Sequence, residues 1–206
     1  MAKLLNSFGR TRTFLDNSEL VIFRKNTSGS WSFTIPETRM YYIDAVAGGG
    51  GGWAVHDHRN NPNDSYLIFG MTGAGSGWSA FGPFYLTKGT VISGSVGSGG
   101  ASKVSDIAAT NLGLHTNNVG NPTTVVIDGT TYTQAAGTAA TINKTSSTEY
   151  GTRTSAVGSE GNMANGGSGG QGSVSVLEGA GAGGTGNGQA MSATNGTAGL
   201  IRVRIA

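Results

Sequence analysis

The sequence contains no cysteine, which excludes disulfide bonds, thiolate metal sites and thiol nucleophiles. Charged residues make up only 12% of the chain, and the formal net charge is +2. Such a small surplus of positive charge gives little reason to expect nucleic-acid binding. No stretch reaches the roughly 20 apolar residues that span a bilayer, and the first residues lack the apolar segment of a secretory signal. We therefore expect neither membrane insertion nor export by that route.

Proline is scarce, with 4 residues, and no segment has helical periodicity for more than two turns. Short apolar or alternating runs are frequent instead, and they predict an all-β protein. The Asp128-Gly129 pair predicts a type I′ hairpin turn, because both residues tolerate positive φ. In the last strand, Arg202 and Arg204 are expected to face water. The expected strands are 20–23, 30–35, 40–47, 66–69, 81–86, 90–96, 123–127, 130–133, 174–177 and 200–205.

Glycine is abundant, with 37 of 206 residues, and it clusters in 48–100 and 158–199. Collagen is excluded, because the spacing is irregular and proline is rare. A flexible linker would need only one tract. We favour a third arrangement, in which extended three-residue-per-turn helices pack side by side and pair their backbone groups. The structural glycines are then Gly48, Gly49, Gly50, Gly51, Gly52, Gly179, Gly181, Gly183, Gly184, Gly186 and Gly188.

The order of these elements resembles the glycine-rich domain of bacteriophage tail-fibre and tail-tip proteins. In that family an aromatic strand ending in proline leads through a second strand into polyglycine, as in Trp31–Pro36 and Tyr42–Gly52 here. The later elements, 73–77, 84–86, 91–100, 125–131 and 196–203, are similar to the rest of the family pattern.

The resemblance implies a jelly-roll-like β-sandwich of about eight strands with packed, polyglycine-II-like segments at 48–52, 70–77, 158–172 and 179–199. It also implies a non-enzymatic virion protein of a tailed phage, at a fibre or baseplate tip, that acts as a receptor-binding adhesin in host attachment. Its partners would be other tail proteins and a bacterial surface glycan or outer-membrane protein, and a homotrimer is favoured. No cofactor is expected.

Two other function classes stay open. The chain could be a purely structural connector or decoration protein of the virion, or a polysaccharide depolymerase. No catalytic constellation supports an enzyme. The G-x-S-x-G match at 166–170 lacks the helix that a nucleophile elbow requires, and the G-x-G-x-x-G match at 181–186 lacks the helix that binds a pyrophosphate.

The division expected along the chain is an N-terminal docking arm, residues 1–28, followed by a glycine-rich β domain, residues 29–206. Polar loops at 53–69, 101–122 and 138–165 are expected to carry the contact surface, with 53–64 irregular. Aromatic, histidine and arginine side chains in these loops are the candidate receptor contacts. They are Trp53, His56, His58, Tyr66, Phe69, Tyr150 and Arg153.

For Trp53 and Tyr66, burial in the core is an equally good interpretation. His56, Asp57 and His58 could bind a metal if the segment were a strand, above all on a trimer axis. A solvent-facing loop is the simpler interpretation, so no metal site is predicted.

Overall fold

The computed structural model describes residues 3–5, 11–13, 21–60, 66–156 and 180–206. All of its regular structure is strand, and the described part of the chain contains no helix that could cross a membrane. The all-β prediction is therefore confirmed. The strands are β1 (Lys3–Leu5), β2 (Thr11–Thr13), β3 (Val21–Lys25), β4 (Gly29–Thr34), β5 (Arg39–Val46), β6 (Trp53–His58), β7 (Tyr66–Met71), β8 (Trp78–Leu86), β9 (Val91–Val96), β10 (Lys103–Ile107), β11 (Gly113–Thr116), β12 (Thr123–Ile127), β13 (Thr130–Gln134), β14 (Thr141–Lys144), β15 (Thr152–Thr154), β16 (Gly186–Asn187), β17 (Ser192–Ala193) and β18 (Leu200–Ile205).

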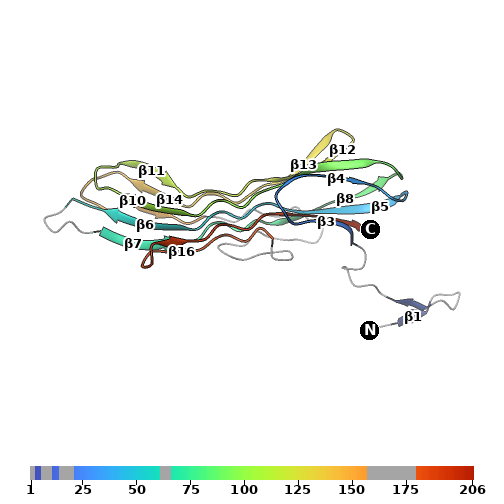
Figure 1. Ribbon diagram of the computed structural model, residues 1–206, viewed down its shortest axis with the longest axis horizontal. Coiled ribbons are helices and arrows are strands. Elements are labelled where there is room, and N and C mark those ends of the chain that lie inside the picture. The colour runs from blue at the N-terminus through green and yellow to red at the C-terminus, as the bar shows by residue number, and fades with distance from the viewer. Residues whose placement is uncertain (1–2, 6–10, 14–20, 61–65, 157–179) are drawn as a thin grey trace.

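The molecule is elongated, with sheets at its two ends and extended chain between them (Figure 1). One end, here called the sandwich end, holds the four-stranded sheets β13-β12-β9-β4 and β3-β18-β5-β8. The other, the far end, holds the three-stranded sheets β10-β6-β7 and β11-β14-β15. The C-terminus lies at the sandwich end (Figure 1).

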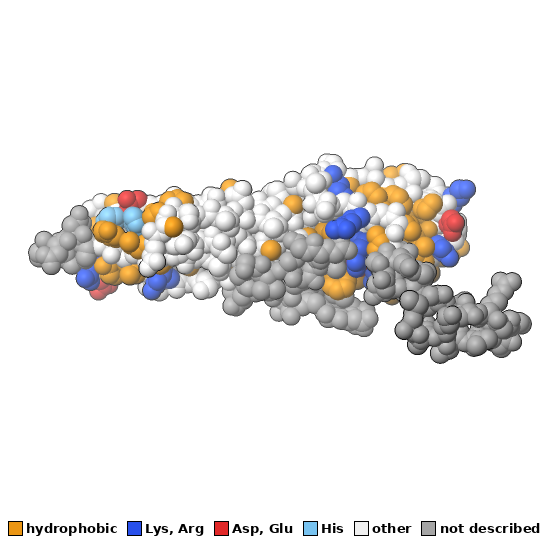
Figure 2. Space-filling model, turned by 60° about the horizontal axis from the view of Figure 1, so that its bottom comes forward, with side chains coloured by type: hydrophobic (Ala, Val, Ile, Leu, Met, Phe, Trp, Pro, Cys, Tyr) orange, Lys and Arg blue, Asp and Glu red, His pale blue; other side chains and the backbone are white. Residues whose placement is uncertain are grey.

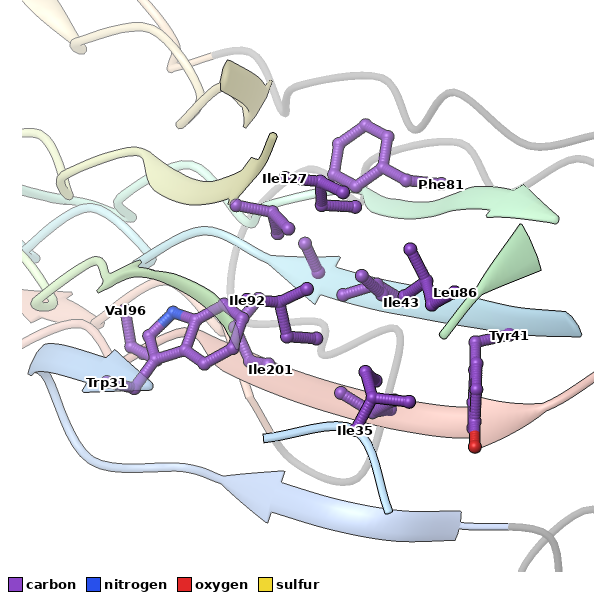
Figure 3. Close-up of a cluster of buried hydrophobic side chains, with 13 residues drawn as sticks. Trp31, Ile35, Tyr41, Ile43, Phe81, Leu86, Ile92, Val96, Ile127 and Ile201 are labelled. Carbon is purple, nitrogen blue, oxygen red and sulfur yellow. The ribbon is translucent and has the colours of Figure 1, made fainter. Parts of the chain in front are cut away.

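The core of the sandwich end lies between its two sheets (Figure 3). Trp31 and Ile92 come from one sheet, and Tyr41, Ile43 and Ile201 come from the other, all of them buried. The alternation of apolar residues along these strands directs them inward. At the tip of the β12–β13 hairpin, Asp128 and Gly129 have φ of 48° and 77°, which confirms the predicted hairpin turn.

The arginines of β18 do not face water, so that expectation is wrong. Arg202 and Arg204 donate from Nε to the buried carboxylate of Asp44, at 2.8 and 3.0 Å to Oδ2. Strand β18 is an inner strand of its sheet, and its register places Arg202 opposite Asp44. A buried carboxylate requires such partners.

The chain runs back and forth between the two ends through segments of one length. Six connections that run from a strand at one end to a strand at the other are each six residues long, and the described stretch 180–185 before β16 runs alongside them. These crossing segments are 47–52, 72–77, 97–102, 117–122, 135–140, 180–185 and 194–199. Figure 1 shows them side by side along the middle of the molecule.

The pentaglycine crossing donates its amides with a period of three residues. Adjacent amides donate to different crossing segments, and amides three residues apart donate to the same segment. The bonds run from Gly48 to Asn121 (2.9 Å), Gly49 to Thr197 (2.9 Å), Gly50 to Ala74 (2.8 Å), Gly51 to Asn118 (2.8 Å) and Gly52 to Thr194 (2.9 Å).

The surrounding crossings bond to one another with the same period. Gly73 and Ser76 donate to Gly184 and Gly181, at 2.8 and 2.9 Å. The amides of Gly196 and Gly199 likewise donate to Gly100 and Gly97, both at 2.9 Å. The backbone groups in the middle of the molecule thus find their partners in neighbouring crossings.

Side chains are excluded where these backbones meet. A Cβ built on Gly48, Gly49, Gly51 or Gly52 would lie 1.9 to 2.2 Å from a carbonyl oxygen of a neighbouring crossing. Four glycines of the last tract are also closely packed, with the nearest atom 2.0 to 2.6 Å from a built Cβ, although only for Gly184 is that atom a carbonyl oxygen of a neighbouring crossing; they are Gly181, Gly184, Gly186 and Gly188. Gly183 is buried. Gly179, segment 158–172 and the expected strand 174–177 lie outside the described residues.

Three stretches expected as irregular or as loops contain strands, so those expectations are wrong. Segment 53–64 contains β6, segment 101–122 contains β10 and β11, and segment 138–165 contains β14 and β15. These strands lack a clear apolar alternation in the sequence, because the far end buries polar side chains, among them Asp57 and Lys144. Within the expected arm 1–28, β3 pairs with β18 and belongs to the sandwich end.

Candidate functional site at the far end

The sheet β10-β6-β7 has one exposed face. His56 of β6 is in register with Asp106 of β10 and with Ile68 of β7, and His58 is in register with Tyr66. Residues in register across a sheet point to the same side, and alternate residues of a strand share that side. We call this side the outer face; it comprises His56, His58, Tyr66, Ile68, Val104 and Asp106, together with Ala54, which is buried.

The opposite face of the same sheet is a core. Trp53, Val55 and Ile107 are buried there with Ile142 of β14, and Phe69 packs at the edge. The indole Nε1 of Trp53 donates to the hydroxyl of Ser105 at 2.6 Å. Trp53 is fully buried, so the structure places it in the core and away from any contact surface.

Lys103 lies against that core. Its Nζ is 4.7 Å from the centroid of the Trp53 ring, and it donates to the backbone carbonyl of Thr116. Partial burial removes water from the ammonium and lowers the pKa of Lys103 below its ordinary value. The side chain thereby ties the start of β10 to the end of β11.

Asp57 and Lys144 form an ion pair with both side chains fully buried. Lys144 Nζ lies 2.7 Å from Asp57 Oδ1 and also donates to the carbonyls of His58 and Glu149, at 2.6 and 3.0 Å. The other carboxylate oxygen accepts from the amide of Gly151 at 2.7 Å. The pair joins the two sheets of the far end and holds β6 in a fixed register.

The outer face carries a cluster of ionisable and aromatic side chains. His58 Nε2 lies 2.6 Å from Asp106 Oδ1. The Tyr66 ring covers both histidines, with centroids 5.1 Å from His56 and 5.4 Å from His58. His56 and His58 are half-buried, whereas Tyr66 and Asp106 are exposed. Figure 2 shows histidine side chains beside an acidic group and hydrophobic groups at this end of the molecule.

A hollow of about 500 Å³ adjoins this cluster. His58 and Asp106 form one wall, and Asn60, Ala108, Ala109 and Thr110 form the rest. It is thus lined by short or polar groups with one imidazole–carboxylate pair. Such a lining offers hydrogen-bond donors and acceptors to a polar ligand.

The remaining candidates lie elsewhere at the far end. The Arg153 guanidinium lies 4.8 Å from the Phe69 ring centroid, and both line a second hollow of about 440 Å³. The Arg59 guanidinium lies 4.7 Å from the Tyr150 ring centroid. The seven candidates therefore fall into four places, and only His56, His58 and Tyr66 share the outer face.

Exposed hydrophobic side chains gather at the far end as well. Five of the nine large hydrophobic residues exposed in the described part of the chain lie on β7, β10, β11 or the connection into β11. They are Tyr66, Ile68, Val104, Leu112 and Leu114, with exposed fractions between 37% and 66%. Exposed aromatic and aliphatic groups around a polar centre are typical of a contact surface.

Sequence reasoning missed Asp106, Val104 and Ile68. The alternation of Trp53-Ala54-Val55-His56-Asp57-His58 could have identified a strand with both histidines on one face. The pairing of β10 with β6 is parallel and brings together residues 50 positions apart, so no local pattern reveals it.

Known proteins give no further guidance. No protein-family model matches the chain, and no curated protein matches its sequence.

Proposed function

We propose that this chain is a non-enzymatic virion protein of a tailed bacteriophage that attaches the particle to the bacterial surface through its far end. The observation that carries the proposal is that the two ends of the molecule differ. One end holds the strand that follows the N-terminal segment, and the other end exposes an apolar and aromatic face around two histidines. In this proposal the N-terminal segment binds other tail proteins, and the outer face binds a surface glycan or outer-membrane protein.

The middle of the molecule supports the proposal by its hydrogen bonding. We infer that the crossing segments form a polyglycine-II-like bundle, because their amides change partner at every residue and return to the same partner after three. Such a bundle is a stiff spacer between a docked end and a binding end. In this view the sandwich end is jelly-roll-like, since the last strand, β18, lies between the early strands β3 and β5.

The chemistry of the outer face favours a glycan. Aromatic rings stack on sugar rings, and the imidazole–carboxylate pair beside the hollow can accept and donate hydrogen bonds to hydroxyl groups. Because Tyr66 and Ile68 are exposed and lie at an edge strand, they are free to contact a ligand without unfolding the sheet.

The test is binding of purified protein to host cells and to isolated lipopolysaccharide. Tyr66→Ala combined with Ile68→Ser is expected to lower the retained fraction at least tenfold. Tyr85→Ala is the matched control, because Tyr85 is 67% exposed but lies at the sandwich end. This variant should bind like the wild type. Equal binding by all three proteins would refute attachment through the outer face.

A structural connector is the second candidate, and exposed side chains at the sandwich end favour it. Met40, Tyr85 and Val91 are 39%, 67% and 59% exposed there. If the chain only joined virion parts, purified protein would bind neither cells nor lipopolysaccharide, and Tyr85→Ala would weaken its incorporation into particles. These outcomes separate the two functions.

A further inference from the structure

Three potential metal ligands meet on the outer face. One nitrogen from each of His56 and His58 and one oxygen of Asp106 all lie within 4.8 Å of one another. The histidines are two residues apart on β6, and the parallel register of β10 sets Asp106 directly beside His56. The sheet thus fixes all three backbone positions, and only side-chain torsions remain to be set.

The donor set is suited to a borderline divalent ion. Two imidazoles and one carboxylate are ligands that zinc accepts in catalytic-type sites, leaving a fourth position for water or another oxygen. With metal–ligand bonds of about 2.0–2.2 Å, tetrahedral ligand atoms lie roughly 3.3–3.6 Å apart. The 2.6 Å between His58 and Asp106 must therefore open by roughly 0.7–1.0 Å, which rotation of the exposed Asp106 carboxylate would allow.

Other contacts hold the ligands in place. Tyr66 packs over both imidazole rings and limits their rotation. The carboxylate between the two histidines, Asp57, points to the other face and is occupied by Lys144 and by the amide of Gly151. Asp106, and not Asp57, is thus the acidic ligand that the fold provides.

A plain ion pair would not explain the whole cluster. His58 pairs with Asp106, whereas His56 has ring contacts with Tyr66 and His58 but no hydrogen-bond or ionic partner among the described residues. We propose that His56, His58 and Asp106 form a binding site for one zinc-class divalent metal ion per chain, with a coordination position open toward solvent.

The test is isothermal titration of the full chain with Zn²⁺ after treatment with a chelator and buffer exchange. One Zn²⁺ per chain is expected, and His56→Ala, His58→Ala and Asp106→Asn should each weaken binding at least tenfold. His115→Ala is the matched control, since His115 is the other histidine of the chain and lies on β11. Its affinity should equal that of the wild type.

Circular dichroism would establish that each variant is folded. A visible absorption band of bound Co²⁺ that is lost in His56→Ala would give a second, independent reading. No binding by the wild type, equal loss in His115→Ala, or one ion per three chains would each overturn the site as proposed. None of these measurements involves host cells, so the result does not depend on the attachment function.

Discussion

At the residue scale, the Asp57–Lys144 pair is the polar contact on which the far end depends. Both side chains are fully buried, and four contacts satisfy the ammonium and the carboxylate, one of them the ion pair itself. Replacing such a pair by apolar groups need not destabilise a protein, but removing one partner leaves a buried charge uncompensated.

We expect Lys144→Met to destabilise the protein by about 3–5 kcal/mol, because the Asp57 carboxylate loses its counter-charge. Chemical denaturation monitored by tryptophan fluorescence measures this, since Trp53 packs in the same core. Glu37→Gln is the control, because Glu37 pairs with Arg39 at 3.5 Å with 70% of its side chain exposed. That change should stay within about 0.5 kcal/mol. Equal effects would mean that the buried pair contributes nothing special.

At the scale of the element, the crossing segments are unlike β-strands, because one segment bonds to several neighbours instead of two. The pentaglycine donates its amides to three other crossings. Because neighbouring backbones surround it, it has no room for side chains. Other crossings carry glycine where their backbones come closest to a neighbouring segment. This accounts for glycine at 97 and 100, at 181 and 184, and at 196 and 199.

Alanine substitutions within the pentaglycine should have graded effects. A Cβ on Gly49 would lie 2.0 Å from the carbonyl oxygen of Ala182, whereas the nearest atom to a Cβ on Gly50 is 3.0 Å away. We expect Gly49→Ala to destabilise the fold by about 3 kcal/mol or more, as overpacking against backbone does, and Gly50→Ala to cost less. Thermal unfolding of both variants checks the order. Identical melting temperatures would contradict the close approach.

Sequence reasoning succeeded for elements with local signals and failed for the others. Strands β4, β5, β9 and β18 alternate apolar residues, and the Asp128-Gly129 turn has its own chemistry. Crossings 117–122 and 135–140 went unrecognised because they contain a single glycine each. In the first, Asn117 replaces a glycine by donating its side-chain amide to the carbonyl of Gly51 at 2.8 Å and accepting from the amide of Ala140.

The candidate site was predictable only in part. His56, His58 and Tyr66 were chosen as aromatic or imidazole groups in a polar stretch, and they do share a face. Trp53 and Phe69 were chosen on the same grounds but point to the core side. The choice did not take into account that alternate residues of a strand point to opposite faces. Asp106 depends on a parallel pairing that no sequence pattern encodes locally.

At the scale of the whole molecule, the described residues connect the two ends through the crossings, so the rigidity of this part of the chain depends on them. If the amides of Gly49, Gly51 and Gly52 are paired as in the structure, they should exchange with solvent only on global unfolding. Hydrogen–deuterium exchange at residue resolution measures this, with the exposed turn at Gly129 as the fast-exchanging reference. Rapid exchange throughout 48–52 would mean that the ends are loosely tethered.

The uniform six-residue crossings restrict how this chain can change over evolutionary time. In the polyglycine-II-like bundle proposed above, adding or losing one residue in any crossing would rotate everything beyond it by a third of a turn and present the wrong groups to its neighbours. Adding a whole triplet would preserve the rotation but lengthen that crossing alone by about 9 Å, which the others cannot match. Insertions and deletions should therefore accumulate in the connections at the two ends, and the span between them should stay constant while the surfaces diverge.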